Sequence, residues 1–404
     1  MNIQALEGVK VASFCWAAAG SWIVKYLAEH GAQVIHIESG RHIDSLRVTP
    51  PYKDGISGVN RSGYFTRYNF NQYCICLDMN KPLAREIAPR IVQWADIVAE
   101  NYTPGTMEKW ELDYENLRKI KPDIIMMRCT SQGETGPHRL QPGVGTHLVG
   151  LSGFLHLTGW PDRGSVVPYG AYTDTIAPRL ATAALLAALE YRHRTGKGQC
   201  IDVSQYETAV EFLAPLVMSY VTNGVIPGAV GNRSHHAAPH GVYPCRGKDR
   251  WCAIAIFTDE EWKSLCQVMG NPEWTTCPRF SDPSRRKDNE DELDVLVAAW
   301  TINFQDEQLM GLLQQARVKA GVVQNAEDVS LDPQLKHRHY SWELSHPEMG
   351  KYHCDAPAFS LSETPCQITR PAPCLGQDNE YVFTKLLGMA DEDFLKLLGE
   401  GVLE

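Results

Sequence analysis

The stretch VKVASFCWAAAGSWIVKYLAEHGAQVIHIE, residues 9–38, decides the fold of this 404-residue chain. Residues 9–14 form a short apolar run typical of a buried strand, and residues 21–30 repeat apolar side chains at helical spacing. Gly31 ends that helix, and residues 33–38 form a second apolar run. Two strands joined by a helix within about 30 residues are expected to run parallel through a right-handed crossover. The stretch therefore predicts a β–α–β unit that begins a parallel sheet.

The same alternation continues along the first half of the chain. Further strands are predicted at 97–99, 124–129 and 200–203, and further helices at 82–94, 114–120, 178–194 and 207–222. Alternating strands and helices predict an α/β fold with a doubly wound, Rossmann-like sheet. Ligands in such sheets bind beyond the carboxyl ends of the strands, so the residues that follow each strand are candidates for a site.

The segment after the first strand lacks the glycine pattern of a dinucleotide site. It reads FCWAAAG over residues 14–20, where G-x-G-x-x-G is needed, and the chain has no G-x-x-x-x-G-K-[ST] loop. We therefore expect neither a nicotinamide cofactor nor a nucleoside triphosphate. Glu38 stands where an acid would hold a ribose hydroxyl, but without the glycines that role has little support.

Composition and charge narrow the possible classes of function. The net charge is -10, from 38 Lys plus Arg against 48 Asp plus Glu, which argues against a nucleic-acid surface. The sequence has no apolar run of about 18 residues, and its start carries no signal-peptide pattern, so we expect no membrane span. The twelve cysteines include no C-x-x-C pair. We therefore expect reduced thiols, no metal site and a cytoplasmic protein.

A chain of this length is long enough for two domains, and its composition changes after Asn223. The stretch that follows is rich in Gly, Pro and His, and the runs 242–245 and 251–256 predict a hairpin. We assign residues 1–222 to the first part of a large domain, 223–320 to a small α+β domain, and 321–404 to a return segment that completes the large domain.

Asp174 is the candidate catalytic residue of the sequence. It stands just before the Ala- and Leu-rich helix 178–194, whose composition indicates burial on most faces. A carboxylate there can cap free backbone N–H groups and meet the positive end of the helix dipole. For an isolated Asp at a helix start this structural role is the usual one, so a catalytic assignment depends on the surrounding motifs.

A series of ordered motifs runs along nearly the whole chain. They are LEGVKVASF with LAEHGAQVIHIE, followed by Asp44 and Arg47; NFNQYCICLDMNK; WADIVAENYTPGTMEKWEL; the SQGETGP turn; and AYTDTIAPRLATAALLAALEYRHRTGKGQCIDVSQYE. Together they resemble the family III coenzyme A transferases of the CaiB/BaiF type, the group that includes formyl-CoA transferase and carnitine CoA-transferase.

The resemblance implies both a fold and a chemistry. Members of this family have a Rossmann-like large domain and a small domain, and two chains interlock as rings in a dimer. The catalytic aspartate of the family corresponds to Asp174. It attacks an acyl-CoA thioester to give a mixed anhydride, and it then passes CoA through an aspartyl thioester to a carboxylic acid acceptor. The resemblance implies acyl-CoA as a substrate and no permanently bound cofactor.

The resemblance also implies CoA contacts, one position at a time. The matching positions are Ala17, Ala18, Leu77, Asn101, Tyr102, Thr106 and Lys109. Two positively charged side chains that are common in the family are missing here, because Ser39 and Thr103 stand where relatives often have Arg. We therefore expect Arg41, Arg47 or Lys109 to supply the positive charge for the CoA phosphates. The glycine-rich lid of formyl-CoA transferase is absent as well, and residues 231–241 are the stretch that can take its place.

Two alternatives and one question stay open at this level. The α-methylacyl-CoA racemases of the same fold need a His-Asp pair where this chain reads PGVG, residues 142–145. Gly145 stands at the acid position, and His147 is out of place for the imidazole. The second alternative is a non-catalytic partner subunit, so the dimer contains either a second copy or a paralogous chain. The sequence does not identify the acids between which CoA is exchanged. Trp16 and Trp160 suggest an aromatic pocket and a benzylsuccinate-type acceptor.

Overall fold

The computed structural model describes residues 3–404, which divide into two compact units. The larger unit contains the residues up to Phe154, Val167–Val225 and Gln334–Glu404, and the smaller unit contains Leu155–Val166 and Ile226–Pro333. The smaller unit therefore extends beyond residue 320 and includes a short segment that composition alone did not mark. Among the described residues, no helix combines the length and the apolar character needed to cross a bilayer.

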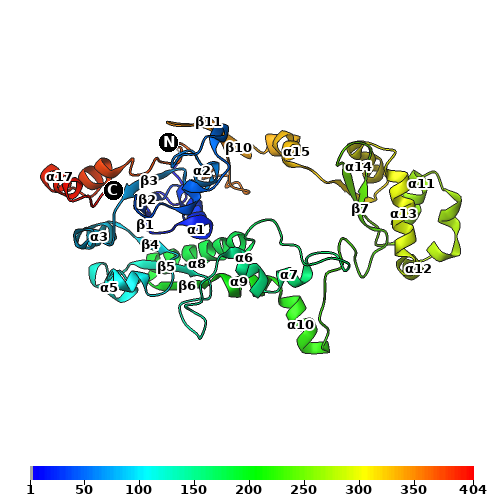
Figure 1. The fold of residues 1–404 in the computed structure, drawn as a ribbon, viewed down its shortest axis with the longest axis horizontal. Helices are drawn as coiled ribbons and strands as arrows, with labels where there is room; N and C mark the ends of the chain where they lie inside the picture. Colours follow the sequence, from blue (N-terminus) through cyan, green and yellow to red (C-terminus); the bar gives the residue numbers. More distant parts are fainter. Residues whose placement is uncertain (1–2) are drawn as a thin grey trace. The chain divides into compact units, whose positions relative to one another are not determined.

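Six parallel strands form the central sheet of the larger unit (Figure 1). They are β1 (Lys10–Ser13), β2 (Gln33–Glu38), β3 (Gln72–Cys76), β4 (Ile97–Glu100), β5 (Ile125–Thr130) and β6 (Cys200–Ser204). Their order across the sheet is β3-β2-β1-β4-β5-β6, which is the order of a Rossmann fold. The predicted doubly wound α/β fold is therefore confirmed. The strand order reverses between β1 and β4, and sheets of this kind bind ligands in the crevice at that point.

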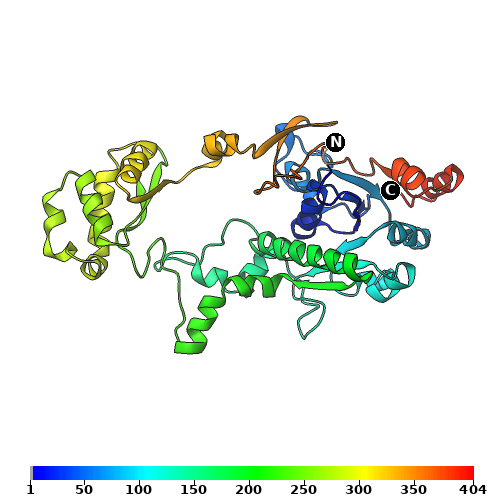
Figure 2. The same cartoon turned by 180° about the vertical axis from the view of Figure 1, so that it is seen from behind.

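Successive residues of a strand point to opposite faces of the sheet, so apolar strand residues leave both faces apolar. Helices cover both of these faces. The helices α1 (Ala17–Glu29) and α8 (Thr173–Thr195) pack on the face to which Val11 and Met127 point. The other face, to which Ala12 and Met126 point, is covered by α3 (Pro82–Trp94), α5 (Tyr114–Ile120), the π-helix Tyr381–Leu386 and α17 (Asp391–Gly399). Figure 2 shows α8 lying alongside the strands that it covers.

Two helices of the larger unit differ from the sequence prediction. The helix expected at 178–194 begins earlier, at Thr173, and Pro178 lies within it. The helix expected at 207–222 is in fact two helices, α9 (Gln205–Phe212) and α10 (Ala214–Asn223). The break has a physical cause, because Pro215 lacks the backbone N–H that would continue the hydrogen-bond pattern.

Short elements complete the larger unit. The strands β10 (Ser341–His346) and β11 (Gly350–Asp355) pair as an antiparallel hairpin. The short helices are η1 (Ser45–Val48), η2 (Lys53–Gly55), α2 (Gly63–Asn69), α4 (Thr106–Lys109) and α6 (Gly145–Leu151). Two more, α7 (Phe154–Leu157) and α16 (Pro333–His337), lie where the chain passes from one unit to the other.

The smaller unit has a sheet and a core of its own. The strands β7 (His240–Pro244) and β8 (Trp251–Ala255) form the predicted hairpin, and β9 (Lys319–Val322) adds a third antiparallel strand. The helices are α11 (Asp259–Val268), η3 (Glu273–Thr276), η4 (Pro278–Phe280), α12 (Pro283–Asp288), α13 (Glu290–Thr301), α14 (Asp306–Gln315) and α15 (Ala326–Leu331). Trp262 and Phe280 lie at the centre of the apolar cluster that these elements enclose.

Candidate active site

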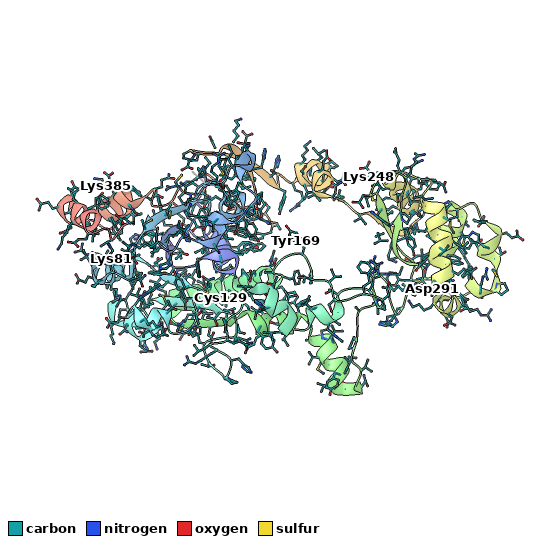
Figure 3. The ribbon with its side chains drawn as sticks, in the orientation of Figure 1. Lys81, Cys129, Tyr169, Lys248, Asp291 and Lys385 are labelled. Carbon is teal, nitrogen blue, oxygen red and sulfur yellow. The ribbon has the colours of Figure 1, made fainter. Side chains whose placement is uncertain are left out.

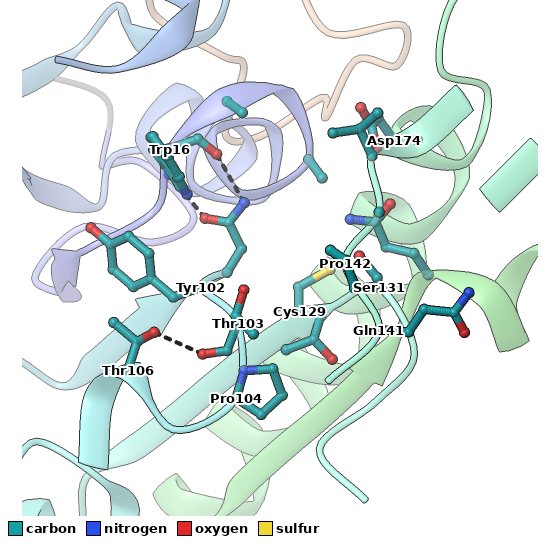
Figure 4. Close-up of a pocket in the computed structure, with 18 of the residues that line it drawn as sticks. Trp16, Tyr102, Thr103, Pro104, Thr106, Cys129, Ser131, Gln141, Pro142 and Asp174 are labelled. Carbon is teal, nitrogen blue, oxygen red and sulfur yellow. Dashed lines mark hydrogen bonds between the residues drawn. The ribbon is translucent and has the colours of Figure 1, made fainter. Parts of the chain in front are cut away.

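A cavity of about 600 Å³ lies at the carboxyl ends of the strands, where the strand order reverses. It is lined by the loops after β1, β4 and β5 and by the first turns of α8 and α9, all in the larger unit. Figure 4 shows Trp16 and Tyr102 on one side of the cavity and Asp174 on the other, with Cys129 and Ser131 between them. Cys129 comes from β5, within the sheet (Figure 3).

A side-chain amide from the loop after β4 holds the loop after β1 in place. The backbone N–H of Trp16 donates to Asn101 Oδ1 at 2.9 Å, and Asn101 Nδ2 donates to the Trp16 carbonyl at 2.9 Å. The backbone N–H of Ala17 donates to Asp44 Oδ1 at 3.0 Å. Gly20 permits this arrangement, because a Cβ at that position would stand 2.6 Å from Asn101 Oδ1. The backbone around Trp16 is therefore fixed before any ligand binds.

A second hollow, of about 310 Å³, shares Trp16, Tyr102 and Thr106 with this cavity and extends to Leu77. The rings of Trp16 and Tyr102 lie 5.9 Å apart, and Tyr102 meets the edge of Trp110 at 5.3 Å. The two hollows together offer aromatic and apolar walls with a few polar groups. This lining suits a ligand that joins an aromatic base to a long, flexible arm.

Asp174 lies in the first turn of α8 and lines the cavity (Figure 4). The sequence analysis placed it before the helix as a possible cap, and that structural role is wrong, because within residues 3–404 its carboxylate accepts no hydrogen bond and forms no ion pair. Burial raises the pKa of Asp174 to about 6. An unpaired carboxylate in a cavity costs free energy, so it is a candidate for chemistry rather than for stability.

Gly145, at the start of α6, makes room for this carboxylate. A Cβ on Gly145 would stand 2.6 Å from Asp174 Oδ1, which is closer than such atoms can approach. A hydrogen bond connects α8 to α6 beside this contact, since Thr173 Oγ1 donates to the Gly145 carbonyl at 3.2 Å. The Asp174 carboxylate therefore packs against a glycine, and a larger residue at position 145 would meet it.

Arg47 does not reach the cavity. Its guanidinium is fully buried and donates to both carboxylate oxygens of Glu38, with Nε at 3.0 and 2.9 Å and Nη2 at 2.6 Å. It also lies over the Phe65 ring at 3.6 Å. Burial alone would raise the pKa of Glu38, but His36 and Arg47 outweigh that effect and hold this pKa well below its ordinary value. The charge of Arg47 is thus taken by Glu38, and both residues have a structural role here.

A second arginine near the cavity is also neutralised by carboxylates. Arg128, in β5, has its guanidinium nitrogens 2.7 Å from Glu100, 2.9 Å from Glu108 and 2.8 Å from Glu134. Among the described residues that line the cavity, only Arg139 carries a positive charge, and no carboxylate of the described chain pairs with it. Arg139 was not among the predicted site residues, although it lies two residues after the SQGETGP turn that the motifs include.

The structure brings most of the predicted site residues together. Those that line the cavity are Ala17, Asn101, Tyr102, Thr106 and Asp174. Leu77 lines the second hollow, and Ala18 is buried behind the β1 loop. Arg41, Arg47 and Lys109 line neither hollow, and Lys109 is exposed on α4. His147 does not line the cavity either; its Nδ1 accepts from the Val144 N–H at 3.3 Å, so no imidazole stands by Asp174 as a racemase would need.

The fold and the cavity define the class: an α/β protein of Rossmann strand order, with a ligand cavity at the switch point that contains an unpaired carboxylate. The chain belongs to CoA-transferase family III, whose family model matches residues 6–379. The family predicted from the motifs is therefore confirmed, and the protein is a CoA-transferase. Its activity involves an acyl-CoA and a carboxylic acid as substrates, consistent with the expected role of CoA.

Relatives of known activity and a solved structure support this assignment. The succinyl-CoA–D-citramalate CoA-transferase of Chloroflexus aurantiacus is 31% identical over 398 residues, which is 98% of each chain. The succinyl-CoA–L-malate CoA-transferase alpha subunit of the same organism is 28% identical, over 98% of this chain and 92% of its own. The crystal structure of a CaiB/BaiF family protein from Brucella suis superposes with a TM-score of 0.87 at 28% identity, over 96% of this chain and 100% of its own.

Gly145→Ala is expected to lower kcat/KM for CoA transfer about a hundredfold, because the new Cβ would stand 2.3 Å from Ala171 Cβ and 2.6 Å from Asp174 Oδ1 and must shift the turn that carries the carboxylate. Gly143→Ala is the matched control, since a Cβ there meets nothing closer than 4.0 Å. Steady-state kinetics of the two variants with one donor and acceptor pair make the comparison. Wild-type kcat/KM in Gly145→Ala would contradict the close packing of Gly145 on Asp174.

Proposed function

We propose that this CoA-transferase uses Asp174 as a covalent carrier of acyl groups and of CoA. The observation that carries the proposal is the unpaired carboxylate in the wall of a substrate-sized cavity. A carboxylate that accepts no hydrogen bonds is ready to attack, because no donor must be displaced first. Its pKa of about 6 still leaves it ionised at neutral pH.

The chemistry proceeds through two acyl exchanges and their reversal. An Asp174 oxygen attacks the carbonyl carbon of the donor thioester, the C–S bond breaks, CoA leaves as a thiolate, and the acyl group stays on Asp174 as a mixed anhydride. The thiolate then attacks the Asp174 carbonyl, the donor acid leaves as a carboxylate, and CoA remains as an aspartyl thioester. The acceptor carboxylate reverses both steps and leaves as its CoA ester. Covalent catalysis in this way divides one difficult exchange into easier steps.

We propose further that CoA lies along the loops that follow β1 and β4. Its pantetheine arm would pass Ala17 toward Asp174, and its adenosine would occupy the second hollow beside Leu77 and Tyr102. Two features support this placement. The two hollows share a wall, and the backbone at Trp16 is fixed in advance, so less ordering is needed when CoA binds.

We propose dicarboxylic acids as the substrate class. The two relatives named above act, by their names, on succinyl-CoA with D-citramalate or L-malate, which are all dicarboxylic acids or their CoA esters. Arg139 supports the proposal, because a guanidinium in the cavity suits the carboxylate that is not activated. A benzylsuccinate-type acceptor is an aromatic member of this class. Trp16 in the cavity wall supports it, whereas Trp160 belongs to the smaller unit and gives no such support.

We propose that the working form is a dimer of interlocked chains, made with a second copy or with a paralogous chain. The helix α10, APLVMSYVTN, supports a dimer, because none of its residues is buried. Its exposed apolar side chains include Val217, Met218 and Val221. A contiguous apolar surface of this kind marks an interface in a soluble protein. A relative named as an alpha subunit supports the possibility of a paralogous partner.

Asp174→Asn and Asp174→Ala are expected to lower CoA transfer by at least about a thousandfold, because they remove the attacking group. The fold should gain stability, by about 1 kcal/mol at neutral pH, since a carboxylate with a raised pKa destabilises the folded state above that pKa. The gain should shrink as the pH falls through about 6, where the folded wild type takes up its proton. Wild-type kcat/KM should fall over the same range. Transfer assays and urea unfolding at several pH values measure these effects.

Asp393→Asn is the matched control for these variants. Asp393 is also an acid in the first turn of a helix, α17, but its side chain is exposed. Transfer by Asp393→Asn should equal that of the wild type, and its stability should not rise. Transfer within about tenfold of wild type in Asp174→Asn would contradict the proposed role of Asp174.

The dimer is expected to persist at low micromolar concentration, because interlocked chains have no folded monomer to release. Val217→Glu combined with Val221→Glu should weaken association, since it buries two charges in the proposed interface. Lys385→Glu changes the net charge by the same amount at an exposed residue of the larger unit (Figure 3) and should leave the dimer intact. Light scattering measures the mass in each case. A stable and active wild-type monomer would refute the proposal.

A further inference from the structure

Two buried polar side chains of the cavity have no hydrogen-bond partner. Thr130 ends β5 and is 3% exposed, and Gln205 begins α9 and is 7% exposed; both line the cavity that contains Asp174. Thr130 Oγ1 and Gln205 Oε1 are enclosed and unbonded. Buried polar atoms are nearly always paired, and leaving one unpaired costs stability. Two such atoms in one cavity therefore mark polar side chains that the described fold does not use, and that are candidates for a role in the reaction.

The two side chains come from neighbouring ends of the sheet. Thr130 is the β5 partner of Ser204 in β6, and Ser204 directly precedes Gln205. Other polar side chains nearby are already used: both amide atoms of Asn101 bond to the Trp16 backbone, and Ser204 Oγ accepts from the Glu207 N–H to cap α9. Thr130 and Gln205 are thus buried polar groups at this edge that remain free to serve a ligand.

The oxygen and the nitrogen of the Gln205 side-chain amide lie in different surroundings. Its Oε1 is enclosed. Its Nε2 is neither enclosed nor bonded within residues 3–404, and Gln205 lines the cavity, so this donor is available to a ligand there. The Thr130 hydroxyl needs only a rotation of its O–H, or of its side chain, to donate to an acceptor beside it. The enclosed Gln205 oxygen is a candidate acceptor, because Gln205 directly follows Ser204, the sheet partner of Thr130.

We infer that Gln205 is a second catalytic residue, which donates a hydrogen bond from Nε2 to the carbonyl oxygen of the substrate acyl group, and that Thr130 is a positioning residue that orients the Gln205 amide. The inference rests on the proposed covalent role of Asp174. When an Asp174 oxygen bonds to the thioester carbon, the π electrons move onto the carbonyl oxygen, which becomes an oxyanion. The pair returns when the C–S bond breaks and the thiolate leaves. A donor already aimed at that oxygen stabilises the charge without reorganisation.

The same donor serves the last step of the reaction. There the CoA thiolate attacks the acceptor carbonyl of the second anhydride, and an oxyanion forms again on a substrate carbonyl oxygen. In the two middle steps the oxyanion forms on the carbonyl of Asp174 itself. Gln205 is thus assigned to the two steps in which the acyl group is received or released, which is the part of the reaction common to every donor and acceptor.

The test is a set of variants that differ by single polar groups. Gln205→Met should lower kcat about a hundredfold with little change in KM, since the lost hydrogen bond strengthens only in the transition state. Thr130→Val should lower kcat about tenfold, and Thr130→Ser, which keeps the hydroxyl, should recover most of the wild-type rate. In the double variant, kcat should be no lower than in Gln205→Met, because Thr130 acts through Gln205.

A structural role would give a different result, and a control separates the two. Thermal unfolding of Gln205→Met and Thr130→Val should occur at or above the wild-type temperature, because each change removes a buried group without a partner. Gln72→Met is the matched control: Gln72 is fully buried in β3, also has an unbonded Oε1, and does not line the cavity. Its kcat should equal that of the wild type.

Each part of the inference can be overturned separately from the proposed function. A kcat within about threefold of wild type in Gln205→Met, or a change in KM alone, would overturn the donor role while the Asp174 result stands. Multiplying losses in the double variant would overturn the positioning role of Thr130. Transfer by Asp174→Asn, in contrast, would overturn the proposed function itself, whatever the effect of Gln205→Met.

Discussion

An unpaired carboxylate held in a cavity is the constraint on which the rest of this site depends. Asp174 is only partly exposed in the cavity wall, burial raises its pKa to about 6, and no described residue forms an ion pair with its carboxylate. The helix α8 is packed on the sheet, which fixes its first turn, and Gly145 leaves space that a Cβ would take from Ala171 and from the Asp174 carboxylate. Two buried arginines of the larger unit are occupied, since Arg47 pairs with Glu38 and Arg128 pairs with three acids. The negative charge of Asp174 therefore stays free for a substrate.

Around Asp174, some groups are held by hydrogen bonds or packing, and others have no partner within the described chain. The β1 loop is fixed by Asn101, and the aromatic wall of Trp16 and Tyr102 is in place. In contrast, Asp174 itself and the guanidinium of Arg139 have no partner within the described chain. A site of this kind gives up stability for reactivity, which is the usual trade at catalytic centres. Under the proposed function, the ligand brings an electrophilic carbonyl to Asp174 and a separate anionic group to Arg139.

Much of the fold could be predicted, because the spacing of apolar residues and the residues that begin or end a helix can be read from short stretches of sequence. The strands at β1, β2, β4, β5 and β6 and the helices between them follow from such patterns, whereas β3, QYCIC, was recognised only as part of a motif. The long helix begins earlier than expected because a proline near a helix start does not end the helix on its amino-terminal side. The division of 207–222 could have been predicted from Pro215.

The candidate site was predictable only where the motifs named it. Asp174 alone looked like a helix cap, and its lack of any partner is a property of packing. Arg47 was expected near CoA, yet its burial against Glu38 depends on how η1 folds onto β2. Arg139 and Gln205 carry no local signal, because the pairing of β5 with β6 and the turn after β5 bring them to the cavity.

The most direct measurement of the central claim is to trap the acyl enzyme. Incubation of the protein with a donor acyl-CoA that it turns over, followed by hydroxylamine, should inactivate it and leave a hydroxamate on Asp174. Peptide mass spectrometry of the segment from Gly170 to Arg179 would locate the modification. Labelling of Asp174 that requires the donor is the result this account predicts. A hydroxamate on another residue, or none with a donor that is turned over, would contradict it.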